Sequence, residues 1–345
     1  MSVYAYGAPS VRGNIRSQAD DFQVTEAVGY EPSGEGEHLW LWVEKRAANT
    51  LDVARALARL AGVHPKHVGF AGLKDRNAVT RQPFTLHLAG RPDPDWADWQ
   101  SDAFQVLSAT RHQRKIQRGR LAGNRFALTI RSLHGNGAEL IQSTLDRRLQ
   151  RIASDGVPNG FGEQRFGGNN VARARALFAG ALKRQPSRSK QGFYLSAARS
   201  LIFNRVLARR IALGHWNRLI DGDIAMLDGR RSIFAADPED LDQRQRCADQ
   251  DLHPTGPMVG LGSEFGPSLA GQIELQAAEQ DADLLEGLVA FGVKAERRSL
   301  RMRVHDLSWR YPDDTTLELS FGLGRGSYAT AVLREVIDYT DASQG

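Results

Sequence analysis

Cysteine is almost absent from this sequence. Cys247 is the only one among 345 residues, so no disulfide can form within the chain, and a zinc site built on several thiolates is excluded. No run of about 18 apolar residues occurs, which is what a membrane-spanning helix requires. The first residues also lack the charged and then apolar pattern of a signal peptide. These absences predict a cytoplasmic protein without a membrane span.

Nucleotide-binding and hydrolase motifs are missing as well. The chain has neither the GxxxxGK(S/T) loop of many NTPases nor the GxSxG turn of α/β-hydrolases. Glycine-rich stretches at 260–266 and 321–327 are predicted to be turns, because neither opens a βαβ unit. His64 and His67 flank Pro65 and have no third ligand nearby, so no metal site is predicted there.

Positive and negative charges are unevenly distributed along the chain. The net charge is only +5, but the segment 111–125 is rich in arginine and contains no acid. Acids gather instead at 237–242 and 279–283. This segregation fits a nucleic-acid partner better than a small metabolite. A solvated basic loop is the alternative interpretation of any one such cluster.

Hydrophobic periodicity predicts the fold class. Strand-like runs with alternating apolar residues occur at 22–24, 38–44, 83–88, 104–108, 126–131, 302–309 and 316–321. Helical spacing covers 50–61, 141–152, 203–211 and 327–336, with Thr50 and Ser327 as expected helix caps. Strands do not alternate strictly with crossover helices. The pattern therefore predicts an α+β fold with a largely antiparallel mixed sheet.

A domain boundary is predicted at 154–170, where glycine, proline and asparagine are concentrated. Beyond it the pattern is helical, with a basic stripe between Arg173 and Lys190, and strand-like character is expected to return only around Arg301. This order predicts a helix-rich domain inserted between two halves of a β-rich domain.

The stretch VGFAGLKDRNAVTRQPF, at 68–84, places one carboxylate between two cations. Its apolar, glycine-containing half ends in Lys74, Asp75 and Arg76, and polar Thr80 and Gln82 follow. One interpretation is a surface turn with a solvated ion pair. The other is a loop whose glycines admit a large substrate and whose carboxylate acts on it.

Several stretches resemble, in the same order, the TruD-type tRNA pseudouridine synthases. The first is the signature GLKDRNAVTRQ at 72–82. The others are DFQVTE at 21–26, SGEGEHL at 33–39, Lys45 with Asn49 and Thr50, GNRF at 123–126, VPNGFGEQRFG at 157–167, RSLIFNR at 199–205, TGP at 255–257 and GSYAT at 326–330. Several ordered motifs across nearly the whole chain are far more specific than any one of them.

This resemblance implies an isomerase that detaches uracil from C1′ at N1 and rejoins it through C5, at uridine 13 of the dihydrouridine arm of tRNA. Asp75 would be the essential carboxylate, either as nucleophile at C1′ or as stabiliser of a glycal-like intermediate. Lys74 and Arg76 would help to keep it ionised. No metal or nucleotide cofactor would be needed, and we expect a monomer.

The resemblance also implies the domain limits and the substrate-binding residues. A pseudouridine-synthase-like catalytic domain would comprise 1–155 and 304–345, and a TRUD-type insertion domain 156–303. Phe22, Asn124 and Phe321 fall on the substrate-contacting positions, with the Phe321 ring stacking on the displaced uracil. For the two phenylalanines, plain core packing is the alternative.

Two other functional classes stay open from the sequence. A non-catalytic RNA-binding protein could use the same basic cleft, although a change at Asp75 would be expected in it. A phosphate-dependent metabolic enzyme could use the glycine-rich loops, but no motif supports one.

Overall fold

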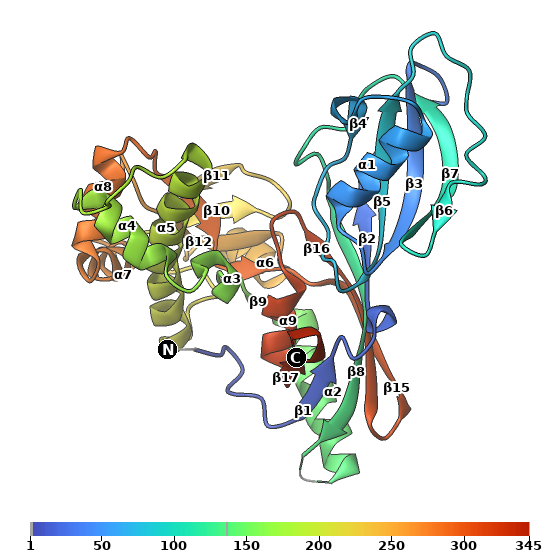
Figure 1. Cartoon of the computed structure of the whole chain (residues 1–345). Helices are drawn as coiled ribbons and strands as arrows, with labels where there is room; N and C mark the ends of the chain where they lie inside the picture. Colours follow the sequence, from blue (N-terminus) through green and yellow to red (C-terminus); the bar gives the residue numbers. More distant parts are fainter. Residues whose placement is uncertain (1–2, 136, 345) are drawn as a thin grey trace. The chain divides into compact units, whose positions relative to one another are not determined.

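The computed structural model of the protein describes residues 3–135 and 137–344. The chain forms two compact units, each assembled from separate segments (Figure 1). We call Ser10–Asp146, His305–Ala329 and Ile337–Gly345 the sheet unit. We call Met1–Pro9, Arg147–Val304 and Thr330–Val336 the helical unit. The domain limits implied by the resemblance stay a prediction.

The sheet unit is built on one large sheet of eleven described strands. These are β1 (Arg12–Ile15), β2 (Phe22–Ala27), β3 (His38–Arg46), β4 (Val68–Gly69), β5 (Val79–His87), β6 (Gln100–Ser101), β7 (Phe104–His112), β8 (Gly123–His134), β15 (His305–Asp313), β16 (Thr316–Gly324) and β17 (Asp338–Asp341). The main order is β15-β16-β8-β2-β5-β3-β7-β6. Only the pairs β2–β5 and β1–β17 are parallel among the pairs described. The predicted α+β fold with a largely antiparallel mixed sheet is confirmed.

The core of the sheet unit follows from the alternation seen in the sequence. Leu39, Leu41 and Val43 lie on one face of β3, because successive side chains of a strand point to opposite faces. They pack against the apolar stripe of helix α1 (Thr50–Leu60), which includes Val53 and Leu57. Short 3₁₀ helices lie at Ala19–Asp21, at Pro65–His67 and, after β17, at Ala342–Gln344. Helices α2 (Ala138–Asp155) and α9 (Ala329–Val336) each contain residues of both units.

The helical unit combines helices with two small sheets. Its helices are α3 (Glu163–Phe166), α4 (Asn170–Phe178), α5 (Arg188–Ala212), α6 (Leu241–Ala248), α7 (Leu269–Glu279) and α8 (Ala282–Ala290). A four-stranded antiparallel sheet has the order β11 (Ile233–Ala235), β10 (Ile224–Leu227), β12 (Leu252–Met258) and β13 (Glu296–Ser299). β9 (Val157–Pro158) pairs with β14 (Arg301–Met302). No helix in the described part of the chain is long and apolar enough to cross a bilayer.

The expectation that strands return only around Arg301 is wrong, because β10, β11 and β12 precede it. Strand β12 is not predicted from the sequence because it contains Pro254 and Pro257. Proline has no backbone N–H to donate to a neighbouring strand, and it usually excludes a central strand. It is nevertheless buried nearly throughout and pairs with strands on both sides. Burial between β10 and β13 thus overrides the local preference. Helix α9 begins at Ala329, two residues after Ser327, and the role of Ser327 as its cap stays a prediction.

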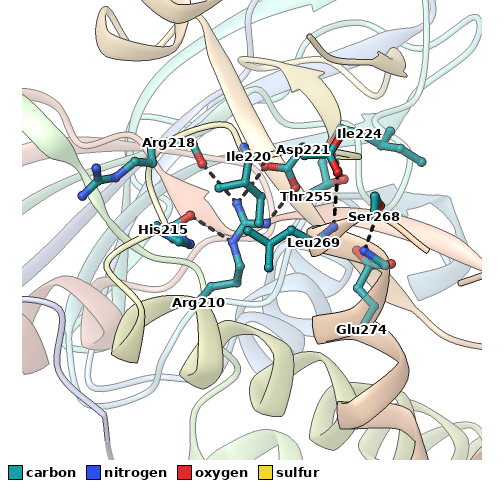
Figure 2. Close-up of polar contacts among 12 residues, drawn as sticks. Arg210, His215, Arg218, Ile220, Asp221, Ile224, Thr255, Ser268, Leu269 and Glu274 are labelled. Carbon is teal, nitrogen blue, oxygen red and sulfur yellow. Dashed lines mark hydrogen bonds and ion pairs between the residues drawn. The ribbon is translucent and has the colours of Figure 1, made fainter. Parts of the chain in front are cut away.

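A buried ion pair between Arg210 and Asp223 lies in the core of the helical unit, and Figure 2 shows Arg210 with its contacts to the backbone of His215 and Arg218. Arg210, in α5, donates to Asp223 through two bonds of 2.8 Å, and both side chains are almost inaccessible to solvent. The same guanidinium donates to the backbone carbonyls of His215 and Arg218. Asp223 also accepts from the backbone N–H of Ile220 at 2.8 Å. This network joins the end of α5 to the chain leading into β10.

Candidate active site

Asp75 lies in the loop between β4 and β5, and its side chain is 56% exposed. Its Oδ2 accepts a bond of 3.1 Å from the guanidinium of Arg16, at the end of β1. Its backbone carbonyl accepts a bond of 2.7 Å from Nζ of Lys45, in β3. The loop is therefore held by two cations while the carboxylate stays accessible.

The cation beside Asp75 is not the one that the sequence predicts. Nζ of Lys74 contacts the carboxylate of Glu26, in β2, instead of Asp75. Arg76 has no side-chain hydrogen bond or ion pair with any described residue. Neither neighbour is therefore paired directly with Asp75, and their expected influence on its charge stays a prediction. Arg16 lies 59 residues before Asp75. Residues adjacent in a loop point in different directions, whereas the sheet brings distant strands together.

Two buried polar side chains, those of Thr50 and Gln82, hold the Asp75 loop through hydrogen bonds to its backbone. The hydroxyl of Thr50 accepts from the backbone N–H of Lys74 at 3.0 Å and donates to Gln82 at 3.1 Å. The amide of Gln82 donates to the carbonyl of Gly72 at 3.1 Å. Thr50 was expected to cap α1, but the residue in the N-cap position is Asn49. The Thr50 hydroxyl instead fixes the loop that carries Asp75.

A row of paired residues crosses five strands on the face near this loop. Lys45 pairs with Thr80, Thr80 with Val24, Val24 with Phe126, and Phe126 with Phe321. Residues directly opposite each other in a sheet have side chains on the same face. The row therefore places the Lys45 ammonium and the two aromatic rings on one side of the sheet.

Three buried oxygens on this face have no hydrogen-bond partner among the described residues. They are Oε1 of Glu26, Oγ1 of Thr80 and Oδ1 of Asn124. Glu26 and Asn124 are directly opposite each other on β2 and β8. An unsatisfied buried polar group costs about 1–3 kcal/mol, so three on one face favour a site that is completed by a ligand.

Burial also shifts the pKa of two charged groups here. Burial raises the pKa of Glu26, and the charge of Lys74 opposes the shift. Burial lowers the pKa of Lys45 to about 8, and the charge of Asp75 opposes it. Charged groups with shifted pKa values beside an accessible carboxylate are typical of functional sites.

The two phenylalanines predicted to bind substrate lie in a buried aromatic cluster. Phe22 and Phe321 are each 2% exposed. The Phe321 ring stacks on Phe126 with centroids 5.3 Å apart, and Phe22 meets Phe126 edge-on at 6.4 Å. The guanidinium of Arg16 lies 3.9 Å from the Phe22 ring centroid, which connects this cluster to Asp75. Their substrate-binding role stays a prediction.

Arg16 and Lys45 are the site residues that sequence reasoning missed. Lys45 belongs to one of the recognised blocks, so a search for cations within those blocks would have found it. Arg16 lies outside them. Its backbone φ is 56°, a left-handed conformation that is uncommon for a residue other than glycine, and such strained residues cluster at functional sites.

The basic segment at 111–125 is partly occupied by internal contacts. Arg111 pairs with Asp93 and Arg125 with Asp306, while the Arg118 guanidinium lies 3.6 Å from the Phe70 ring centroid. Fewer of these cations are available to a nucleic acid than the sequence suggested. Among the described residues, no group of three or more His, Cys, Asp or Glu is placed to hold a metal ion.

The sequence is similar to one family of known proteins along almost its whole length. The family model of tRNA pseudouridine synthase D (TruD) matches residues 1–175 and 169–336. The tRNA pseudouridine synthase D of Methylococcus capsulatus is 45% identical over 337 residues, which cover 97% of this chain and 94% of that protein. The one from Pseudomonas aeruginosa is 45% identical over 344 residues, covering 99% and 94%.

The fold agrees as well. A crystal structure of TruD from Methanosarcina mazei matches with a TM-score of 0.78, covering 100% of this chain and 98% of the other, at 24% identity. The two relatives are similar to this chain along almost their whole length. The chain belongs to the tRNA pseudouridine synthase D (TruD) family.

Proposed function

We propose that this protein converts uridine to pseudouridine in tRNA, at uridine 13 of the dihydrouridine arm, with Asp75 as the acting carboxylate. The observation that carries the proposal is the position of Asp75. Its carboxylate is accessible and paired with Arg16, and its backbone is held by Lys45. Membership of the TruD family supports the reaction class.

The proposed reaction breaks the N1–C1′ bond, and the electron pair of that bond leaves with N1 of the uracil. Asp75 either attacks C1′ and forms an ester, or stabilises the glycal formed when the 2′ proton leaves. The base then turns, and C5 forms the new bond to C1′ while the ester bond to Asp75 breaks or, on the glycal route, while a proton returns to C2′. C5 loses its proton and N1 gains one, so the overall change is an isomerisation. It needs no oxidant, metal or nucleotide cofactor.

We further propose roles for the neighbouring residues. Oδ1 of Asn124 is buried and unpartnered, which suits a hydrogen bond from a base edge or a ribose hydroxyl. Phe22 and Phe321 would form the apolar wall of the base pocket. Residues 156–303 would be the insertion domain, and the protein would act as a cytoplasmic monomer.

The function is tested with a tRNA transcript that carries uridine at position 13. Purified protein is incubated with it, and pseudouridine is mapped along the transcript. We expect one product, at position 13, and none in a matched transcript with cytidine there. Pseudouridine at another position would contradict the proposed specificity. Tight tRNA binding without any product would favour the non-catalytic RNA-binding alternative.

Substitutions of Phe321 test whether its ring reaches the substrate. We expect Phe321→Leu to lower kcat/KM roughly tenfold to a hundredfold, because base–aromatic contacts are worth about 1–3 kcal/mol. Phe321→Tyr keeps the aromatic face, and a ring that borders the proposed base pocket has room there for a hydroxyl, so both activity and melting temperature should be kept. Phe84, which is fully buried under α1, provides the control. Phe84→Tyr should lower the melting temperature, because its hydroxyl is buried without a partner. The same behaviour in Phe321→Tyr, with little loss of activity in Phe321→Leu, would place Phe321 in the core alone.

A further inference from the structure

Residues 164–220 of the helical unit contain twelve Lys and Arg and no Asp or Glu. Six of these cations have side-chain partners within the protein: Arg165, Arg175, Arg199, Arg205, Arg210 and Arg218. The other six have no side-chain hydrogen bond or ion pair with a described residue: Arg173, Lys183, Arg184, Arg188, Lys190 and Arg209. Five of these six lie between 173 and 190, so the unpaired charge is concentrated in one place.

A cavity of about 460 Å³ lies at this concentration of charge. Arg173, Arg184 and Lys190 line it, and the amide side chains of Asn169 and Gln185 add polar groups. No acidic residue lines it among those that the structure describes. A pocket with three unpaired cations and no internal counter-charge is typical of an anion-binding site.

The beginning of helix α5 forms part of the same pocket. Ser187 caps this helix by accepting from the backbone N–H of Lys190, and the first turn contains no acidic residue. The N-terminus of a helix has a partial positive charge, so Arg188 and Lys190 in the first turn are unfavourable there. An anion in the pocket would offset this repulsion, since it interacts favourably with the cations and with the positive end of the helix.

An exposed aromatic ring accompanies the pocket. Phe193 is 59% exposed and follows Lys190 by three residues on α5, which places the two on the same side of the helix. Cationic side chains beside an exposed ring are the combination that binds single-stranded nucleic acid, through phosphate contacts and base stacking. This combination favours RNA over an acidic protein segment as the occupant.

We propose that this pocket binds a phosphodiester group of the tRNA substrate, with Arg173, Arg184 and Lys190 as its ligands. The guanidinium groups can each donate two parallel hydrogen bonds to phosphate oxygens, and Lys190 supplies a point charge. The inference rests on the proposed function, because that function supplies the RNA. It adds a binding site in a unit separate from the one that holds Asp75.

The test is the salt dependence of tRNA binding by an Arg184→Gln/Lys190→Gln variant, measured by fluorescence anisotropy with labelled tRNA. We expect Kd to rise roughly tenfold at low salt, and the slope of log K against log salt to fall in magnitude by about 0.7–0.9 for each lost contact. Raising tRNA above the new Kd should recover pseudouridine formation. Arg209→Gln/Arg244→Gln is the matched control, because it removes two exposed, unpaired cations from the same unit.

Three results would overturn the proposal. One is an equal change of Kd and slope in the test and control variants. Another is binding of inorganic phosphate that depends on Arg184 and Lys190 while tRNA affinity stays unchanged, which would indicate a small-anion site. The third is binding of an acidic peptide that depends on these cations, again with unchanged tRNA affinity. Failure of the proposed function is recognised separately, because a wild-type protein that binds tRNA through this pocket but forms no pseudouridine would disprove the reaction alone.

Discussion

An Asp75→Asn variant is expected to bind tRNA with nearly wild-type affinity and to form no pseudouridine. The amide has the volume of the carboxylate but lacks its charge, and the proposed chemistry at C1′ depends on that charge. The loop should keep its place, because the amide oxygen of asparagine can still accept from Arg16 and the other anchors bond backbone groups. Lys45 bonds the backbone carbonyl of Asp75, and Thr50 and Gln82 bond backbone groups of Lys74 and Gly72. We expect a loss of at least about a thousandfold in the single-turnover rate.

The matched control is Asp102→Asn, which makes the same chemical change at an exposed position of the sheet unit. It should leave the rate, the tRNA affinity and the melting temperature unchanged. Single-turnover measurements at saturating tRNA separate chemistry from binding. If Asp75→Asn retained even about a tenth of the wild-type rate, another group would have to carry the reaction.

Substitution of Arg210 by methionine is expected to destabilise the helical unit by about 3–5 kcal/mol. The side chain is 2% exposed, and its removal leaves the carboxylate of Asp223 buried with only the Ile220 N–H as a donor. It also leaves the carbonyls of His215 and Arg218 without the guanidinium. Hydrogen exchange of amides in α5 and β10 measures the effect within this unit, so no two-state unfolding of the whole chain need be assumed.

Two further variants make this prediction specific to the buried charge. Arg246→Met removes an exposed partner of Asp251, and an exposed pair contributes only about 0–1 kcal/mol. The double variant Arg210→Met/Asp223→Leu removes both buried charges, and we expect it to be less destabilised than Arg210→Met alone. Equal effects of Arg210→Met and Arg246→Met would show that the buried pair adds no special stability.

The sequence alone determined the features that depend on neighbours along the chain. Alternation predicted β3, β8 and β16, since a strand with one buried face must repeat every two residues. Apolar spacing predicted α1 for the corresponding reason in a helix. The contiguous signature at 72–82 identified the family and selected Asp75 from 40 acidic residues.

Only the tertiary structure decided which groups meet across the sheet. It paired Asp75 with Arg16 rather than Lys74, because β-strand pairing brings together residues 59 positions apart. It buried Phe321 against Phe126, which the periodicity of either strand does not reveal. It also separated the arginines of the helical unit into paired and unpaired groups. The local sequence does not predict these contacts, because they form between distant segments whose relative directions are set by packing.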